Sequence, residues 1–335
     1  MQGHNSLKKL LAMLTAVCCV LFPHLTAYRV VSIRALPIYR QDVSGGDRIH
    51  FLKTGSSDAM ILESEGRFAM VDAGEDTDNP RGFPWLELPG YEQEILRYLK
   101  QNCADENGKV HLDFILGTHA HSDHIGGFDT IILDPDVTVD RAYLKAYDSS
   151  RIHDHEVTDW DNQEVYDQMV TALQARNTPL IRNPDPVTFV FGHFTVTLIN
   201  AVDPEADGKV GENDNSFGVL LEKNGTKIFL AGDMDNNSGD ETRLASVIGK
   251  VDLLKVGHHG YGGSSSEGFI STLKPEVCVV TNNRYGPDHK TISSIVKICR
   301  HDRIYLTGCE SGVLAVIGDH GSIDYYGGVC DWKVK

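Results

Sequence analysis

The sequence GTHAHSDHIGG at residues 117–127 places three histidines and one aspartate within six positions and ends on two glycines. It follows the apolar run HLDFIL, which is typical of a buried strand that stops just before the first histidine. Side chains two apart in an extended segment project to the same side, so His119 and His121 are expected to bind one ion together. Asp123 and His124 lie where the chain turns after the strand, and they are expected to bind a second ion nearby.

The residue types in this segment are those that bind transition-metal ions. Neutral imidazole and carboxylate together suit Zn²⁺, with Mn²⁺ or Fe²⁺ as alternatives. Gly126 and Gly127 allow the backbone to pass close to the site, because neither carries a Cβ. A polar surface loop with unconnected histidines is the competing interpretation, but the spacing of the four residues argues against it.

HxHxDH after a strand resembles the signature of the metallo-β-lactamase-fold hydrolases. MVDAG at 70–74 resembles the first motif of that family, whose aspartate supports the metal loop, so Asp72 is expected to orient a ligand histidine. FLAGD ending at Asp233 resembles the fourth motif, whose aspartate bridges both metal ions. The resemblance implies an αββα sandwich, which is an α/β fold of two mixed β-sheets flanked by helices.

LLKVGHHGYGGSSS at 253–266 narrows the resemblance to one branch of the family. That branch includes the competence proteins of DNA uptake and the secreted phosphorylcholine esterases that act on teichoic acids. The resemblance implies that His258 completes the second metal site and that His259 lies near the substrate. Adjacent histidines on a strand point to opposite sides, so only one of the two is expected to bind metal.

GENDNS at 211–216 departs from the pattern of many family members, which place a histidine there as the third ligand of the first metal ion. Asp214 or Asn215 is a possible oxygen ligand in this loop, and the competence-type branch has a similar Asn-Ser pair. A histidine from elsewhere is the other possibility. The candidate histidines are His153, His155 and His193.

The expected reaction is hydrolysis by a hydroxide held between two Zn²⁺ ions about 3.5–4 Å apart. Metal-bound water ionises near neutral pH, so the site needs no separate strong base. His259 is the first candidate to stabilise the charge that develops on the leaving group, and His289 in YGPDHK is the second. The predicted catalytic residues are therefore Asp123, Asp233, His259 and His289.

Strand and helix patterns along the rest of the chain agree with a sandwich of two sheets. Three short strands are expected at 48–53, 59–63 and 68–72, and a helix is expected at 92–102. Hairpins, further strands and helices follow, and no repeat or linker divides the chain. We therefore expect one hydrolase domain at residues 45–335.

Residues 1–27 have the layout of a secretory signal peptide or an uncleaved N-terminal anchor. Lys8 and Lys9 precede a short apolar run, and small residues follow near Ala27. The protein is therefore expected to be secreted or held at the cell surface, with membrane contact only through this segment if it stays uncleaved. The five cysteines beyond it are scattered and lack CxxC spacing, which does not indicate a disulfide framework.

The formal net charge of −16 argues against a general nucleic-acid-binding surface. The favoured substrate is a phosphoester or phosphodiester in a small molecule or a cell-surface polymer, such as a phosphorylcholine group. A quaternary ammonium group needs aromatic side chains around it. The candidates for that role are Trp85, Tyr91, Trp160 and Tyr261. A competence-type nuclease and a non-catalytic metal-binding module are the alternatives.

Overall fold

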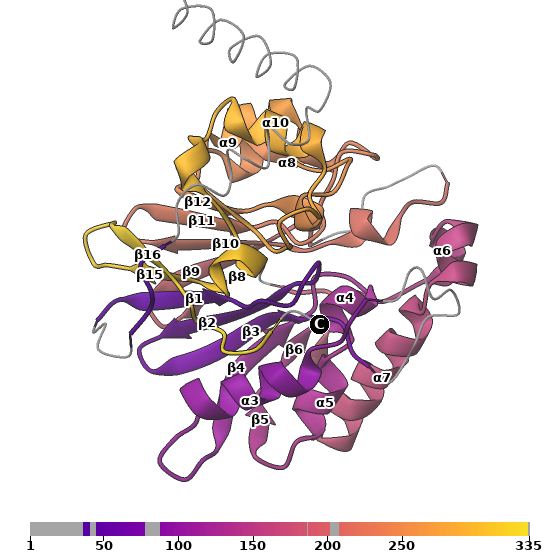
Figure 1. Cartoon of the computed structure of the whole chain (residues 1–335). Coiled ribbons are helices and arrows are strands. Elements are labelled where there is room, and N and C mark those ends of the chain that lie inside the picture. Colours follow the sequence, from indigo (N-terminus) through magenta and orange to yellow (C-terminus); the bar gives the residue numbers. More distant parts are fainter. Residues whose placement is uncertain (1–35, 41–44, 78–87, 186, 202–207, 334–335) are drawn as a thin grey trace, which may run out of the picture.

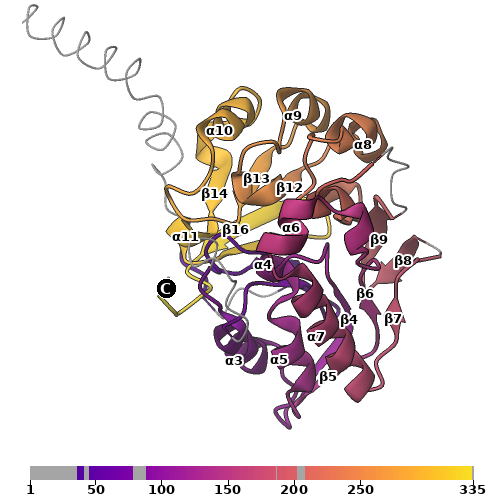
Figure 2. The ribbon, with the colours of Figure 1, turned by 90° about the vertical axis from the view of Figure 1, so that its right-hand side faces the viewer.

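Two β-sheets lie face to face and carry helices on their outer surfaces, as Figures 1 and 2 show in two views. This arrangement confirms the expected α/β sandwich with two mixed sheets. The computed structural model describes residues 36–40, 45–77, 88–185, 187–201 and 208–333. The predicted signal or anchor segment and Trp85 lie outside these residues.

The first sheet is mixed and has the strand order β16-β15-β1-β2-β3-β4-β6-β7, with β5 paired to β4. The pairs from β3 to β7 are parallel, and those from β16 to β3 are antiparallel. Its strands are β1 (Asp47–Phe51), β2 (Ala59–Ser64), β3 (Arg67–Ala73), β4 (Val110–Leu116), β5 (Val137–Val139), β6 (Ala142–Tyr143), β7 (Leu180–Ile181), β15 (Val313–Ile317) and β16 (Ile323–Gly327).

The second sheet has the order β14-β13-β12-β11-β10-β9-β8. Strands β11 to β14 are parallel, with Ile228 opposite Leu253 between β11 and β12. Asn224 and Gly225 both have positive φ and form the predicted tight turn between β10 and β11. The strands are β8 (Thr188–Phe191), β9 (Phe194–Ile199), β10 (Gly218–Lys223), β11 (Thr226–Leu230), β12 (Leu253–Lys255), β13 (Val277–Val280) and β14 (Ile304–Leu306).

Helices cover both outer faces of the sandwich and bury apolar side chains against the sheets. The longer helices on the first sheet are α3 (Glu92–Asn102), α5 (Phe128–Leu133) and α7 (Asn162–Ala175). Those on the second sheet are α8 (Asp240–Ile248), α9 (Glu267–Leu273) and α10 (His289–Val296). Short helices and turns are α4 (Ser122–Ile125), α6 (Asp154–Asp159), α11 (Thr307–Glu310), η1 (Ser149–Arg151), η2 (Glu212–Asn215), η3 (Gly257–Gly260) and η4 (His301–Arg303).

Three apolar cores therefore separate the four layers. Phe114 and Phe217 belong to the core between the two sheets, Phe128 to the core beneath the first group of helices, and Phe269 to the core beneath the second. The strands expected at 48–53, 59–63 and 68–72 and the helix at 92–102 are present within one or two residues of their predicted bounds.

No described helix is both long enough and apolar enough to cross a membrane. Cys103, Cys278, Cys299, Cys309 and Cys330 are free thiols.

Candidate metal centre

Chain segments that leave neighbouring strand ends bring the predicted ligands together. The segment from His119 to His124 follows β4, Asp233 follows β11, and His259 follows β12. Strands β11 and β12 are parallel, so their carboxyl ends lie at one edge of the second sheet. The segments that follow meet the segment after β4, and the meeting point is buried.

His124, Asp233 and His259 form the centre of this cluster. The Nε2 atom of His124 lies 3.1 Å from Asp233 Oδ1, and Nε2 of His259 lies 3.3 Å from Asp233 Oδ2. The two Nε2 atoms are 3.2 Å apart. Asp123 Oδ2 approaches His259 Nε2 at 3.3 Å. Two imidazole nitrogens and two carboxylates therefore converge on one point.

Two further carboxylates hold the outer nitrogens of these rings. Nδ1 of His124 lies 2.8 Å from Asp72 Oδ2, and Nδ1 of His259 lies 3.2 Å from Asp58 Oδ1. A carboxylate accepts a hydrogen bond from Nδ1–H, so the Nε2 atom of a neutral ring carries a lone pair. Asp72 therefore orients the His124 ring.

His119 and His121 form the second half of the cluster, and one ring nitrogen of each again contacts a neighbouring side chain. His119 Nε2 and His121 Nδ1 face one another at 3.0 Å. The opposite nitrogen of His121 lies 3.4 Å from Glu156 Oε2, and that of His119 lies 3.0 Å from Thr118 Oγ1. Burial, together with the charge on His124, holds the pKa of His119 well below its ordinary value. The ring is therefore neutral, as a metal ligand must be.

The donor atoms suit a divalent cation. Oδ1 of Asp123 is buried without a hydrogen-bond donor among the described residues. Burial opposes a charge on His124, but Asp233, Asp72 and Asp123 outweigh it and raise the pKa of His124 to about 10. A cluster with this excess of negative charge binds a proton tightly, and a cation can replace that proton.

The paired histidines stand in exchanged positions relative to the sequence-based expectation. The ligand position was expected for His258, but His259 is the buried ring in the cluster, and His258 Nε2 lies 3.9 Å from Asp233 with 23% of its side chain exposed. The reason is local: both residues have positive φ in η3, so the alternation of a strand does not continue through them. Asp72 also has positive φ, and such backbone concentrates at functional sites.

The loop that lacks the family histidine contributes a glutamate to the surroundings of the first site. The Asn215 amide donates to Glu212 Oε2 at 2.8 Å, and Asp214 accepts from Ser238. Glu212 is buried, and its Oε1 accepts the Ala120 N–H at 2.9 Å. The expected ligand role of Asn215 stays a prediction.

The remaining histidine candidates lie outside the central cluster. His193 is half exposed in the β8–β9 turn and contacts Asp47. His153 and His155 lie at the start of α6, where Glu156 stands between them and His121. His289 begins α10, with Nδ1 3.6 Å from Asp288.

Aromatic side chains border the cluster on two sides. The Trp160 ring lies 4.5 Å from the His121 ring, and the Tyr261 ring lies 5.5 Å from His258. Tyr91 is fully buried in the core, so it is not positioned to meet a substrate.

The family model described as "Beta-lactamase superfamily domain" matches residues 70–266, which include every residue of the cluster except Asp58. The chain belongs to the metallo-β-lactamase-fold superfamily. Proteins of this fold are typically metal-dependent hydrolases, and the buried Asp/His cluster of this chain is suited to divalent metal ions.

Two curated relatives carry competence-type names. "ComE operon protein 3" of Bacillus subtilis is 26% identical over 276 residues, which is 76% of this chain and 33% of the relative. "Recombination protein 2" of Haemophilus influenzae is 25% identical over 240 residues, which is 72% of this chain and 25% of the relative. The chain thus spans a third or less of their length. Among solved structures, the metallo-β-lactamase fold protein YhfI of Bacillus subtilis has a TM-score of 0.46 at 9% identity and covers 78% of this chain and 97% of that one.

Sequence reasoning missed four residues that surround the metallo-β-lactamase motifs. Asp58 pairs with Lys255 inside the protein, Glu156 contacts His121, and Glu212 accepts the Ala120 N–H. Asp58 precedes β2 in SSDAMIL, and Lys255 is the last residue of the buried strand β12, after two leucines. A charged residue inside a buried strand was the available signal for Lys255, because such a charge needs a partner.

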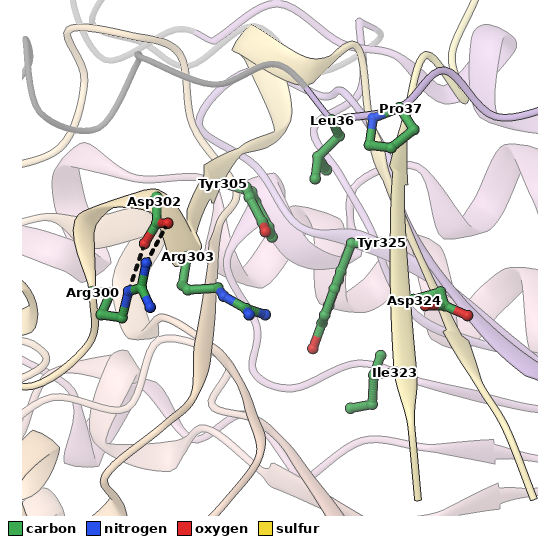
Figure 3. A pocket seen from close by; sticks show the side chains of 9 residues that line it. All are labelled: Leu36, Pro37, Arg300, Asp302, Arg303, Tyr305, Ile323, Asp324 and Tyr325. Atoms are coloured by element: carbon green, nitrogen blue, oxygen red, sulfur yellow. Dashed lines mark hydrogen bonds and ion pairs between the residues drawn. The ribbon is translucent and has the colours of Figure 1, made fainter.

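A separate pocket of about 440 Å³ lies between η4 and β16, and none of its lining residues belongs to the cluster. Figure 3 shows the Arg303 side chain pointing toward Tyr325, while Arg300 is paired with Asp302. This pocket is therefore independent of the candidate metal centre.

Proposed function

We propose that the protein is an exported dinuclear-metal hydrolase of phosphoester or phosphodiester bonds. Export is proposed from the layout of residues 1–27. The observation that carries the proposed chemistry is the convergence of His124 Nε2 and His259 Nε2 on the carboxylate of Asp233. Lone pairs and carboxylate oxygens at such short distances repel one another unless a proton or a cation lies between them.

The ligands divide into two groups that share Asp233. His119 and His121 would hold the first ion. The second ion would be held by Asp123, His124 and His259. Zn²⁺ suits this donor set, with Mn²⁺ or Fe²⁺ as alternatives. When bound, such ions polarise the phosphoryl group and lower the pKa of water toward neutrality.

His258 takes over the substrate-facing role first expected for His259. Both ring nitrogens of His259 are engaged, one by Asp58 and the other within the cluster. His258 is partly exposed beside Asp233 and lies 3.4 Å from the Asn213 amide. An imidazole in this place donates a hydrogen bond to a phosphoryl oxygen or to the leaving group. His289 remains a second candidate for the same step.

A phosphorylcholine-type substrate is supported by aromatic rings at the border of the site. Trp160 and Tyr261 lie beside ligand-bearing segments and offer π-faces for a quaternary ammonium group. The net charge of −16 also favours a cationic substrate group.

A competence-type nuclease is the second candidate, because both curated relatives match more than 70% of this chain. The acidic charge balance of this chain counts against a nucleic-acid substrate. A non-catalytic metal-binding module is the third interpretation.

A substrate panel with matched variants separates these functions. The purified chain is loaded with Zn²⁺ or Mn²⁺ and tested on nitrophenyl phosphorylcholine, bis-nitrophenyl phosphate, single-stranded DNA and a cephalosporin. We expect turnover of the first two substrates, loss of roughly 10³-fold or more in Asp233→Asn, and unchanged rates in the surface variant His193→Asn. Faster cleavage of DNA supports the nuclease. Full activity of Asp233→Asn, or no turnover by a fully metal-loaded protein, contradicts the proposal.

A further inference from the structure

A second group of metal-binding side chains lies at the start of α6, outside the dinuclear cluster. His153, His155 and Glu156 each place one nitrogen or oxygen atom within 4.8 Å of the others. His153 Nδ1 lies 3.7 Å from Glu156 Oε1, and the two imidazole rings are stacked with centroids 5.6 Å apart. The two rings are exposed and the carboxylate is buried, so the group opens to solvent on one side only.

The geometry of the helix start brings these three side chains together. His153 is the N-cap residue of α6, and Glu156 lies three positions later, where helical side chains meet on one face. Glu156 donates its backbone N–H to the His153 carbonyl at 3.0 Å, and His153 donates to the carbonyl of Val210 at 2.9 Å. The backbone that carries the group is therefore fixed at both ends.

The two oxygens of Glu156 face different neighbours. Oε2 accepts the Glu212 N–H at 3.0 Å and lies 3.4 Å from His121 Nε2, while Oε1 faces His153. One oxygen of the carboxylate is therefore directed toward the outer histidines.

We propose that His153, His155 and Glu156 form an additional cation site that takes Zn²⁺ or a similar borderline transition-metal ion. Two imidazoles and one carboxylate are a donor set that Zn²⁺ accepts, with the remaining position open to water. Because Glu156 contacts His121 through its other oxygen, this carboxylate links the outer ion to the dinuclear centre. The outer ion fixes the start of α6 beside Trp160 at the border of the site.

A third His/Asp group on the opposite part of the first sheet serves as a comparison. His111, Asp113 and Asp140 also lie within 4.8 Å of one another. There the Arg67 guanidinium is already paired with Asp113, which places a positive charge where a cation would have to bind. We therefore expect no tightly bound ion at His111.

Metal stoichiometry tests the outer site without relying on activity. The full chain is stripped of metal, equilibrated with Zn²⁺ by dialysis, and analysed for bound zinc. His153→Ala and His155→Ala are each expected to bind one equivalent less than the unaltered chain, whereas His111→Ala binds the same amount. Co²⁺ absorption spectra of the same proteins should lose one component in the two α6 variants only. Thermal unfolding of the metal-free proteins checks that each variant folds.

A variant of the dinuclear centre separates this inference from the proposed function. The double variant Asp233→Asn/His259→Ala should lose the zinc of the dinuclear centre and keep one equivalent at the outer site. Adding His155→Ala to this double variant should remove that remaining equivalent. Equal zinc content in the unaltered chain and both α6 variants overturns the inference. An equal loss in His111→Ala also overturns it, because exposed histidines would then bind zinc without a specific site.

Discussion

Asp58 Oδ1 lies 3.2 Å from His259 Nδ1, and the other oxygen of the same carboxylate is paired with the buried Lys255 ammonium. Both partners are fully buried, and Lys255 also donates to the Gly232 carbonyl at 2.9 Å. Burial opposes the ionisation of Asp58, but Lys255 and His259 outweigh it and lower its pKa to about 2. One ion pair therefore connects a strand of the second sheet to the orientation of a ligand ring.

Removal of one partner of this pair should destabilise the fold. Lys255→Met leaves the Asp58 charge buried without its ammonium, and we expect the free energy of unfolding to fall by about 3–5 kcal/mol. In the double variant Asp58→Asn/Lys255→Met the loss should be smaller than the sum of the single losses. Urea unfolding of the four proteins measures this double-mutant cycle. Strict additivity of the two losses contradicts the pairing.

Replacement of Asp72 should weaken metal binding more than it weakens the fold. Asp72→Asn removes the charge that holds the Nδ1 proton of His124, so we expect metal affinity to fall roughly 10–100-fold. Competition with a chromophoric chelator measures the affinity. Asp113→Asn is the matched control, because Asp113 is a buried carboxylate that pairs with Arg67 instead of a histidine in the cluster. Equal affinity in Asp72→Asn and the unaltered chain is the outcome that rejects this role.

The absence of a side chain at Gly127 is expected to be essential. A Cβ at this position meets the Ala73 carbonyl oxygen at 2.5 Å, so Gly127→Ala must displace backbone of β3. We expect a loss of about 1–3 kcal/mol in the free energy of unfolding, together with weaker metal binding. Gly268 has open space at the same point and is helical, so Gly268→Ala should be neutral or stabilising by up to about 1 kcal/mol. Equal stability of the two variants, measured in urea, goes against this explanation.

Glu241 should make the stability of the metal-free protein depend on pH. Burial raises the pKa of Glu241 from 4.5 to about 7 despite the backbone N–H donors of Ser265 and Ser266. The folded protein then binds this proton more tightly than the unfolded chain. The contribution of Glu241 is therefore most favourable below pH 4.5 and is lost as pH rises through about 7, by about 3 kcal/mol in total.

Urea unfolding at about pH 5 and about pH 8 tests this contribution in EDTA-treated protein. Glu241→Gln should show a smaller loss of stability between the two pH values than the unaltered chain. The control variant Glu267→Gln alters an exposed carboxylate on α9 and should leave the pH dependence unchanged. An unchanged pH dependence in Glu241→Gln removes the assignment.

The sequence by itself determined the fold class and the chemical character of the site. His119, His121, Asp123 and His124 are local in sequence, so their spacing indicated metal binding before any tertiary contact was known. The apolar periodicity of α3 and the strand patterns were equally local, because secondary structure follows short-range periodicity.

Only the tertiary structure decided which of the adjacent histidines is buried in the cluster and which carboxylates hold the ligand rings. His258 and His259 are adjacent in the sequence, and both have positive φ. The directions of their side chains follow from this backbone conformation, which strand periodicity does not predict. In the sequence, Asp58 and Glu156 are far from the histidines that they contact in the folded protein. Contacts of this kind arise from how strands and helices pack, and a single sequence contains no local signal for them.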